Sequence, residues 1–94
     1  MERAAIVTGG GTGIGRATAL ALHRDGFRLV IAGRRPEPLE ETRALIGQDC
    51  AVYPGDIREP EVSAGLVEEC MSQFGRIDCL VNNGVYQGVW ATWQ

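Results

Sequence analysis

The sequence contains no lysine, and all nine of its basic residues are arginines, set among twelve acidic residues. The net charge of −3 and the scattered arginines argue against the basic surface by which proteins bind nucleic acid. No apolar run approaches the ~20 residues that a membrane-spanning helix requires. The amino terminus leads directly into a strand-like pattern without a signal peptide, so we expect a cytoplasmic protein that binds neither nucleic acid nor membrane.

Cysteine and histidine are also scarce. Cys50, Cys70 and Cys79 lack C-x-x-C spacing and lie in apolar segments, which predicts small buried side chains in a reducing compartment. His23 is the one histidine, and we expect it to be solvated rather than a ligand or a base. We therefore expect no metal site. Ninety-four residues, 45% of them apolar, suit one small globular domain.

Apolar runs and segments of helical period alternate along the chain. The runs predict strands over residues 4–7, 29–32, 50–53 and 77–81. Helices are expected from Ile14 to Arg24, between Pro36 and Gly47, and from Pro60 to Phe74. This alternation predicts an α/β fold with a parallel sheet of about four strands, in the order 3-2-1-4, and three helices. The apolar face of the first helix is expected to consist of Ile14, Ala17, Leu20 and Ala21.

A glycine-rich turn, residues 9–15, joins the first strand to the first helix. Glycine permits a positive φ and lets the backbone approach a ligand closely, and a helix N-terminus attracts a pyrophosphate. A merely tight turn needs one or two glycines, so five in seven residues favour phosphate binding. A P-loop is excluded, because Arg16-Ala17 stands where that motif needs lysine and a hydroxyl residue.

Three motifs together resemble the short-chain dehydrogenase/reductase family. Thr8-Gly9-x-x-x-Gly13-x-Gly15 is similar to the family's T-G-x-x-x-G-x-G cofactor signature. Gly55-Asp56-Ile57 resembles the element after the third strand, and Leu80-Val81-Asn82-Asn83-Gly84 resembles the L-V-N-N-A-G at the end of the fourth. The sequence departs from the family pattern at Gly84 and Val85, which stand where alanine and glycine are usual.

The resemblance implies a Rossmann-type half-domain that binds NAD(P) over residues 1–83, followed by an irregular tail over residues 84–94. In the family the acid at Asp56 contacts adenine, although a turn residue that bonds its own backbone is an alternative. Asn82 and Asn83 would brace the fourth strand and lie beside the cofactor. The cofactor-binding residues that we expect are Gly9, Gly11, Thr12, Gly13, Ile14, Gly15, Arg34, Arg35, Asp56, Ile57 and Asn83.

The end of the second strand indicates which cofactor is bound. Family members that bind NAD carry an acid there, but this sequence has Gly33 followed by Arg34 and Arg35. A guanidinium can bind a 2′-phosphate through paired, charge-assisted hydrogen bonds, whereas a carboxylate would repel it. We therefore favour NADP(H) over NAD(H), the alternative being that the two arginines only solvate a loop.

The resemblance assigns no catalytic residue within this chain. Family members use a tyrosine as general acid/base with a lysine four residues later, but Ile57 follows Tyr53 at that spacing and Trp90 follows Tyr86. We expect the cofactor-binding portion of an oxidoreductase that transfers hydride between NADP(H) and a carbonyl or alcohol, truncated and inactive alone. The alternatives are a binding module that self-associates or joins a partner chain through the exposed edge of the fourth strand, and a non-functional product.

Overall fold

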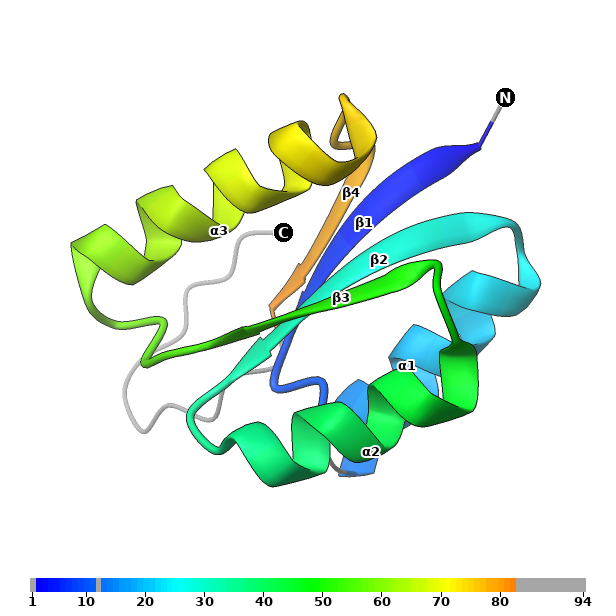
Figure 1. Cartoon of the computed structure of the whole chain (residues 1–94), viewed down its shortest axis with the longest axis horizontal. Helices are drawn as coiled ribbons and strands as arrows, with labels where there is room; N and C mark the ends of the chain where they lie inside the picture. The colour runs from blue at the N-terminus through cyan, green and yellow to red at the C-terminus, as the bar shows by residue number, and fades with distance from the viewer. Residues whose placement is uncertain (1, 12, 83–94) are drawn as a thin grey trace.

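The computed structural model describes residues 2–11 and 13–82, which form one parallel sheet with helices on both faces (Figure 1). The strand order is β3-β2-β1-β4, as the sequence predicts. The strands are β1 (Arg3–Thr8), β2 (Phe27–Gly33), β3 (Cys50–Pro54) and β4 (Cys79–Asn82). The helices are α1 (Gly13–Arg24), α2 (Pro36–Ile46) and α3 (Pro60–Phe74).

The two central strands are buried on both faces, which explains their continuous apolar sequence. Residues 4–7 of β1 and 29–32 of β2 are at most 1% exposed. A strand that is covered on both faces carries apolar side chains at consecutive positions, so the apolar runs of the sequence identified these two strands. The register places Ile6 beside Val30 of β2 and beside Leu80 of β4.

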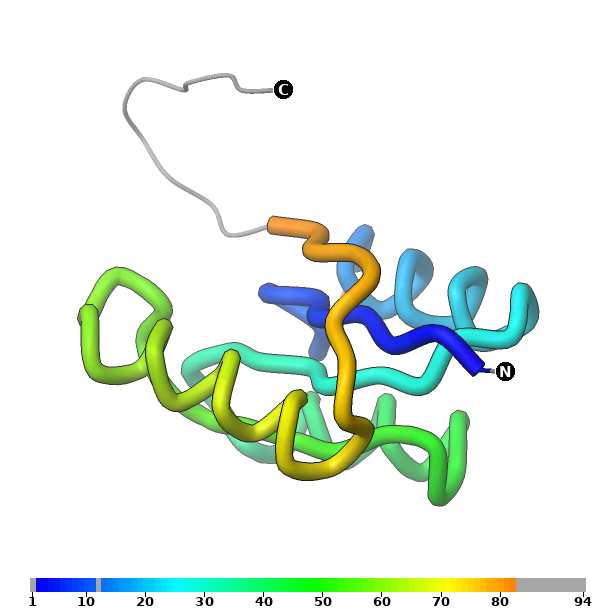
Figure 2. Tube along the Cα trace, turned by 90° about the horizontal axis from the view of Figure 1, so that it is seen from above, coloured from blue at the N-terminus to red at the C-terminus, as the bar shows by residue number. Residues whose placement is uncertain are grey.

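The helices divide between the faces of the sheet. Ala19 of α1 and Leu39 and Ile46 of α2 share one core cluster, whereas Leu66 and Cys70 of α3 belong to a second cluster on the opposite face. Figure 1 shows α3 across the sheet from the other two helices, and α1 and α3 also lie apart in the perpendicular view of Figure 2. The connections α1 and α2 thus cover one face, and the chain changes face after β3, where α3 leads over the opposite face to β4 on the other side of β1. The strand order therefore reverses between β1 and β4. In open α/β sheets, ligands bind beside such a reversal, at the carboxyl ends of the strands.

The predicted apolar face of α1 was largely wrong. Leu20 packs against the core, but Ile14 is 76% exposed and Ala17 and Ala21 are exposed as well. The buried residues are Gly15 and Ala19. Close packing of Gly15 on the preceding turn fixes the rotation of the helix, and a helix rich in alanine gives little apolar contrast between its faces.

The fourth strand begins two residues later than the apolar run predicts. Asp78 lies before it: its backbone N–H donates to the Ala4 carbonyl at 2.8 Å, and its carboxylate accepts the Ala4 N–H at 2.9 Å. Within the described residues β4 pairs with β1 alone. The expected tail over residues 84–94 lies outside the part that the structure describes. In that part, none of the helices has the length and apolar character needed to span a bilayer.

Candidate functional site

A cleft of about 770 Å³ lies at the carboxyl ends of β1, β2 and β3. Its volume falls within the range typical of pockets for small molecules and cofactors. The described residues that line it come from these strand ends, from the starts of α1 and α2 and from the loop after β3. They are Thr8, Gly9, Gly11, Gly13, Ile14, Gly15, Ala32, Gly33, Arg34, Arg35, Pro38, Leu39, Gly55, Asp56, Ile57 and Arg58.

The glycine turn forms the floor of the cleft next to the start of α1. A Cβ atom on Gly15 would overlap the carbonyl oxygen of Gly9, so only glycine lets the helix approach the turn this closely. The first turn of α1 contains no acidic residue. Gly13, Ile14 and Gly15 at the start of α1 line the cleft, so the positive end of the helix dipole lies there with no carboxylate in the same turn, an arrangement that suits an anion.

Arginine side chains dominate the electrostatics of the cleft. Three of the described lining residues, Arg34, Arg35 and Arg58, are arginines, whereas Asp56 is the one acidic residue among them. The side chains of Arg34 and Arg35 are exposed, no hydrogen bond or ion pair joins them to other described residues, and the charge of Arg34 acts on the Asp56 carboxylate. They follow Gly33 at the end of β2, so their charges are available to a ligand that carries a phosphate there.

Asp56 already has partners in the loop after β3. Its Oδ1 accepts the backbone N–H of Arg58 at 3.0 Å, and the Arg58 guanidinium reaches Oδ1 at 3.1 Å and Oδ2 at 2.8 Å. These hydrogen bonds and the positive charge of Arg58 lower the pKa of the Asp56 carboxyl to about 2. The turn role is therefore present, and the carboxylate is ionised where it lines the cleft.

The structure gathers the predicted site residues that it describes around this one cleft. Gly9, Gly11, Gly13, Ile14, Gly15, Arg34, Arg35, Asp56 and Ile57 all line it. Thr12 and Asn83, which were also predicted, lie outside the described residues. The preceding residue, Asn82, accepts a hydrogen bond from the Thr8 hydroxyl at 2.8 Å through Oδ1, which joins the ends of β4 and β1.

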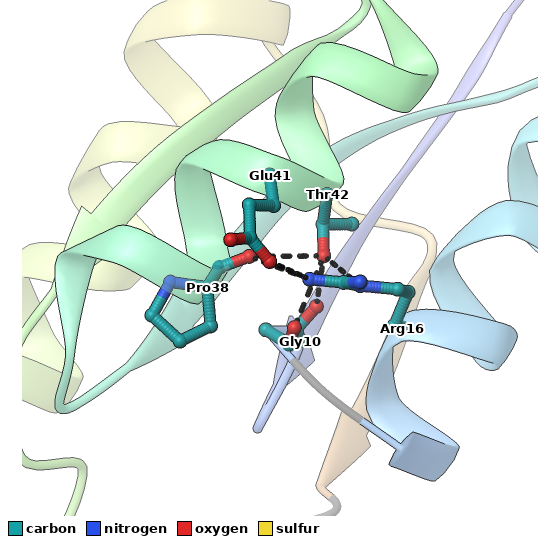
Figure 3. Close-up of polar contacts among 6 residues, drawn as sticks. Gly10, Arg16, Pro38, Glu41 and Thr42 are labelled. Carbon is teal, nitrogen blue, oxygen red and sulfur yellow. Dashed lines mark hydrogen bonds and ion pairs between the residues drawn. The ribbon is translucent and has the colours of Figure 1, made fainter.

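Sequence reasoning missed the residues behind the glycine turn. The buried hydroxyl of Thr42 and the guanidinium of Arg16 contact each other and the backbone of the turn and of α2 (Figure 3). A signal was present, because Leu39, Thr42 and Ile46 share the buried face of α2. A polar residue between two apolar ones on such a face needs a buried partner. Arg58 was also missed, since no sequence pattern distinguishes a functional arginine in an exposed loop from any other exposed arginine.

Other reactive side chains lie away from the cleft. The Tyr53 hydroxyl packs against α3, where a Cβ atom on Gly65 would overlap it. Cys50 and Cys70 are buried, as expected, whereas Cys79 is half-buried, and burial raises the pKa of the Cys50 thiol to about 12. His23 lies 3.5 Å from the Asp49 carboxylate. Across residues 2–11 and 13–82, no three histidine, cysteine or acidic side chains are placed to hold a metal ion.

The chain matches a family model described as short chain dehydrogenase over residues 3–91. A probable 2,4-dienoyl-CoA reductase of Bacillus subtilis is 36% identical over an alignment of 86 residues that covers 87% of this chain and 34% of the relative. Glucose dehydrogenase of Caenorhabditis elegans, solved in its apo form, superposes with a TM-score of 0.82 at 37% identity, covering 86% of this chain and 37% of that one.

A third similar protein was solved with a dinucleotide bound. It is 3-ketoacyl-(acyl-carrier-protein) reductase from Brucella melitensis, complexed with NADH, with a TM-score of 0.80 at 29% identity over 83% of this chain and 32% of that one. The chain thus spans about a third of the length of the proteins that it matches.

Proposed function

The chain belongs to the short chain dehydrogenase family, and on that premise we propose that its cleft binds NADP(H). The proposal rests on one arrangement, in which the glycine turn at the start of α1 and the exposed Arg34 and Arg35 after β2 line the same cleft. The first part suits the pyrophosphate and the second suits the 2′-phosphate of the adenosine. We assign residues 1–83 as the cofactor-binding half-domain on this basis.

The preference for NADP(H) over NAD(H) rests on the end of β2. Gly33 offers no carboxylate to a ribose 2′-hydroxyl, and Arg34 and Arg35 offer two guanidinium groups to a phosphate. The Asp56 carboxylate, which lines the cleft beyond them, is assigned to the adenine, with Ile57 beside it. The Asp56 carboxylate is paired with Arg58, but its oxygens keep lone pairs that can accept a hydrogen bond from the adenine amino group.

For the whole protein we propose hydride transfer between NADP(H) and a carbonyl or alcohol substrate. The relatives whose names state an activity are dehydrogenases and reductases, which supports this reaction class. The described residues supply the cofactor side of the reaction. The catalytic acid/base and the substrate site are not assigned to any of them.

Titration of the chain with NADPH and NADH tests the proposal. Arg34→Ala is expected to weaken NADPH binding by about tenfold and to leave NADH binding nearly unchanged, because it removes a charge-assisted hydrogen bond to the 2′-phosphate. Arg24→Ala is the matched control, since Arg24 is exposed at the far end of α1. Equal losses for both cofactors would contradict the NADP(H) assignment, and no binding of either by the wild-type chain would overturn the function.

A second proposal, association through β4, follows from the open edge of the sheet. Within the described residues β4 has a strand neighbour on one side only, and Leu80 on it is 60% exposed. An unpaired edge strand offers its backbone groups to another chain. Sedimentation velocity should show a dimer that Leu80→Glu dissociates. A wild-type monomer at all concentrations would refute self-association.

A further inference from the structure

We propose that Thr42 and Arg16 are positioning residues for the dinucleotide, acting from behind the glycine turn. Neither residue lines the cleft. Together they bind the Gly10 carbonyl to α2, so that the N–H of the same peptide, that of Gly11, is left for phosphate. The inference rests on the proposed function, because it concerns how that cleft is held ready for its ligand.

Thr42 is the centre of this arrangement. Its side chain is completely buried, and its Oγ1 accepts a hydrogen bond from Arg16 Nε at 2.8 Å. The same hydroxyl faces three carbonyl oxygens, those of Gly10 at 3.0 Å, Pro38 at 3.2 Å and Gly11 at 3.4 Å. A hydroxyl has one proton to donate, and Gly10 offers the shortest contact. The bond joins residues 32 positions apart in the sequence.

Arg16 orients the hydroxyl and adds its own contacts to α2. Its Nη2 donates to the Pro38 carbonyl and to Glu41 Oε1, both at 3.1 Å (Figure 3). Because Nε already donates to Thr42 Oγ1, the hydroxyl proton must point elsewhere, toward the carbonyl oxygens of the turn and of α2. The guanidinium thereby directs the hydroxyl proton toward these carbonyl oxygens, of which that of Gly10 is the nearest.

The orientation of the Gly10 carbonyl decides what the turn presents to a ligand. In a trans peptide the C=O and the following N–H point in opposite directions, and no described peptide is cis. The bond that turns the Gly10 carbonyl toward Thr42 therefore turns the Gly11 N–H away from it. Without this bond the peptide could rotate, and a carbonyl oxygen facing a pyrophosphate would repel it.

The same contacts fix the distance between the two phosphate-binding parts of the cleft. Gly11 packs directly on the first turn of α2, where a Cβ atom would lie 2.8 Å from Pro38 Cβ. That turn follows immediately on the arginine pair, and Arg35 is the N-cap residue of α2. Holding α2 on the glycine turn thus holds Arg34 and Arg35 at a set distance from the pyrophosphate position.

Thr42→Val tests the inference, because valine keeps the shape of threonine and removes the hydroxyl. We expect it to weaken the binding of both NADPH and NADH, by about tenfold or more, since both ligands contain the pyrophosphate. Thr42→Ser restores the hydroxyl and should restore binding. Thr18→Val is the matched control, because the Thr18 hydroxyl donates within α1, to the Ile14 carbonyl at 2.8 Å. Circular dichroism and urea unfolding of each variant verify the fold.

Wild-type affinity in a folded Thr42→Val variant would overturn the inference, as would a loss that serine does not restore. If Thr42→Val does not fold, Arg16→Lys replaces it, because lysine keeps the charge and loses the paired geometry. An affinity for both cofactors that is unchanged in Arg16→Lys would also overturn the inference.

A readout without ligand separates this inference from the proposed function. The carbonyl ¹³C resonance of Gly10 should move in Thr42→Val and return in Thr42→Ser, because a carbonyl that loses its hydrogen bond changes its shielding. If the wild-type chain binds no dinucleotide, the proposed function fails, and this resonance still decides whether Thr42 positions the turn. An identical resonance in all three chains would show that it does not.

Discussion

Arg58 holds the carboxylate of Asp56 by both oxygens, from a side chain two residues further along the same loop. Its Nη2 lies 2.8 Å from Oδ2, its Nε 3.1 Å from Oδ1, and its backbone N–H also donates to Oδ1. Such a paired geometry restricts the rotation of a carboxylate more than a single bond does. Asp56 therefore presents an oriented, ionised group to the cleft before any ligand arrives.

Arg58→Met should release this carboxylate. The pKa of Asp56, which is about 2 beside Arg58, is expected to rise toward the ordinary value of about 4, because the largest cause of the shift is the hydrogen bond from the guanidinium. Titration of the side-chain carboxyl ¹³C resonance measures the change. The Asp78 resonance serves as an internal control, since Arg76 is its partner. An unchanged Asp56 pKa would mean that the backbone N–H of residue 58 and the charge of Arg34 sustain it without the guanidinium.

Gly33→Asp should reverse the cofactor preference. A Cβ atom at Gly33 would meet Leu39 Cδ2 at 3.4 Å, an ordinary contact, so a side chain fits there. The new carboxylate would repel a 2′-phosphate and accept a hydrogen bond from a ribose hydroxyl, weakening NADPH binding by about tenfold or more and strengthening NADH binding. Gly33→Asn, which has the same shape without the charge, separates electrostatics from packing. The assignment fails if the asparagine and aspartate variants discriminate alike between the cofactors.

The sequence predicted the strands and the glycine turn, because their signals are local. Buried strands read as apolar runs, and glycines in the turn mark close approaches that any alternative residue would prevent, as at Gly15. The rotation of α1 was not predicted, since an exposed Ile14 looks like a core residue in an apolar pattern. The link between Thr42 and Gly10 joins distant segments, and only the packing of α2 on the turn brings them together.

Gly15→Ala tests the close approach of α1 to the turn. The added methyl would overlap the backbone carbonyl of Gly9, which no side-chain rotation relieves, so we expect a loss of about 2 kcal/mol or more in the free energy of unfolding together with loss of dinucleotide binding. Gly13→Ala is the comparison, because Gly13 has a φ of 56° and open space around its Cβ position. That variant should lose only about 1 kcal/mol from backbone strain. Equal unfolding energies for the two would contradict the packing account.

Acid should weaken the fold partly through Asp78, which connects the start of β1 to the residues before β4. Arg76 reaches both carboxylate oxygens at 2.7 Å, and with the Ala4 N–H these bonds lower the pKa of Asp78 to about 2. The folded state therefore binds this proton less readily than the unfolded chain, whose aspartates titrate near about 4. The resulting stabilisation is complete above about pH 4 and is lost as the pH falls through about 2.

Asp78→Asn removes this dependence, so its free energy of unfolding in urea should be lower than that of the wild type at pH ~6 and should fall less between pH ~4 and pH ~2. A remaining slope is expected, because Asp56 has its pKa lowered in the same way. Asp25→Asn, which changes the charge equally at an exposed side chain without partners among the described residues, should follow the wild-type curve. A wild-type slope in Asp78→Asn would show that the Asp78 contacts to Ala4 and Arg76 do not couple proton binding to folding.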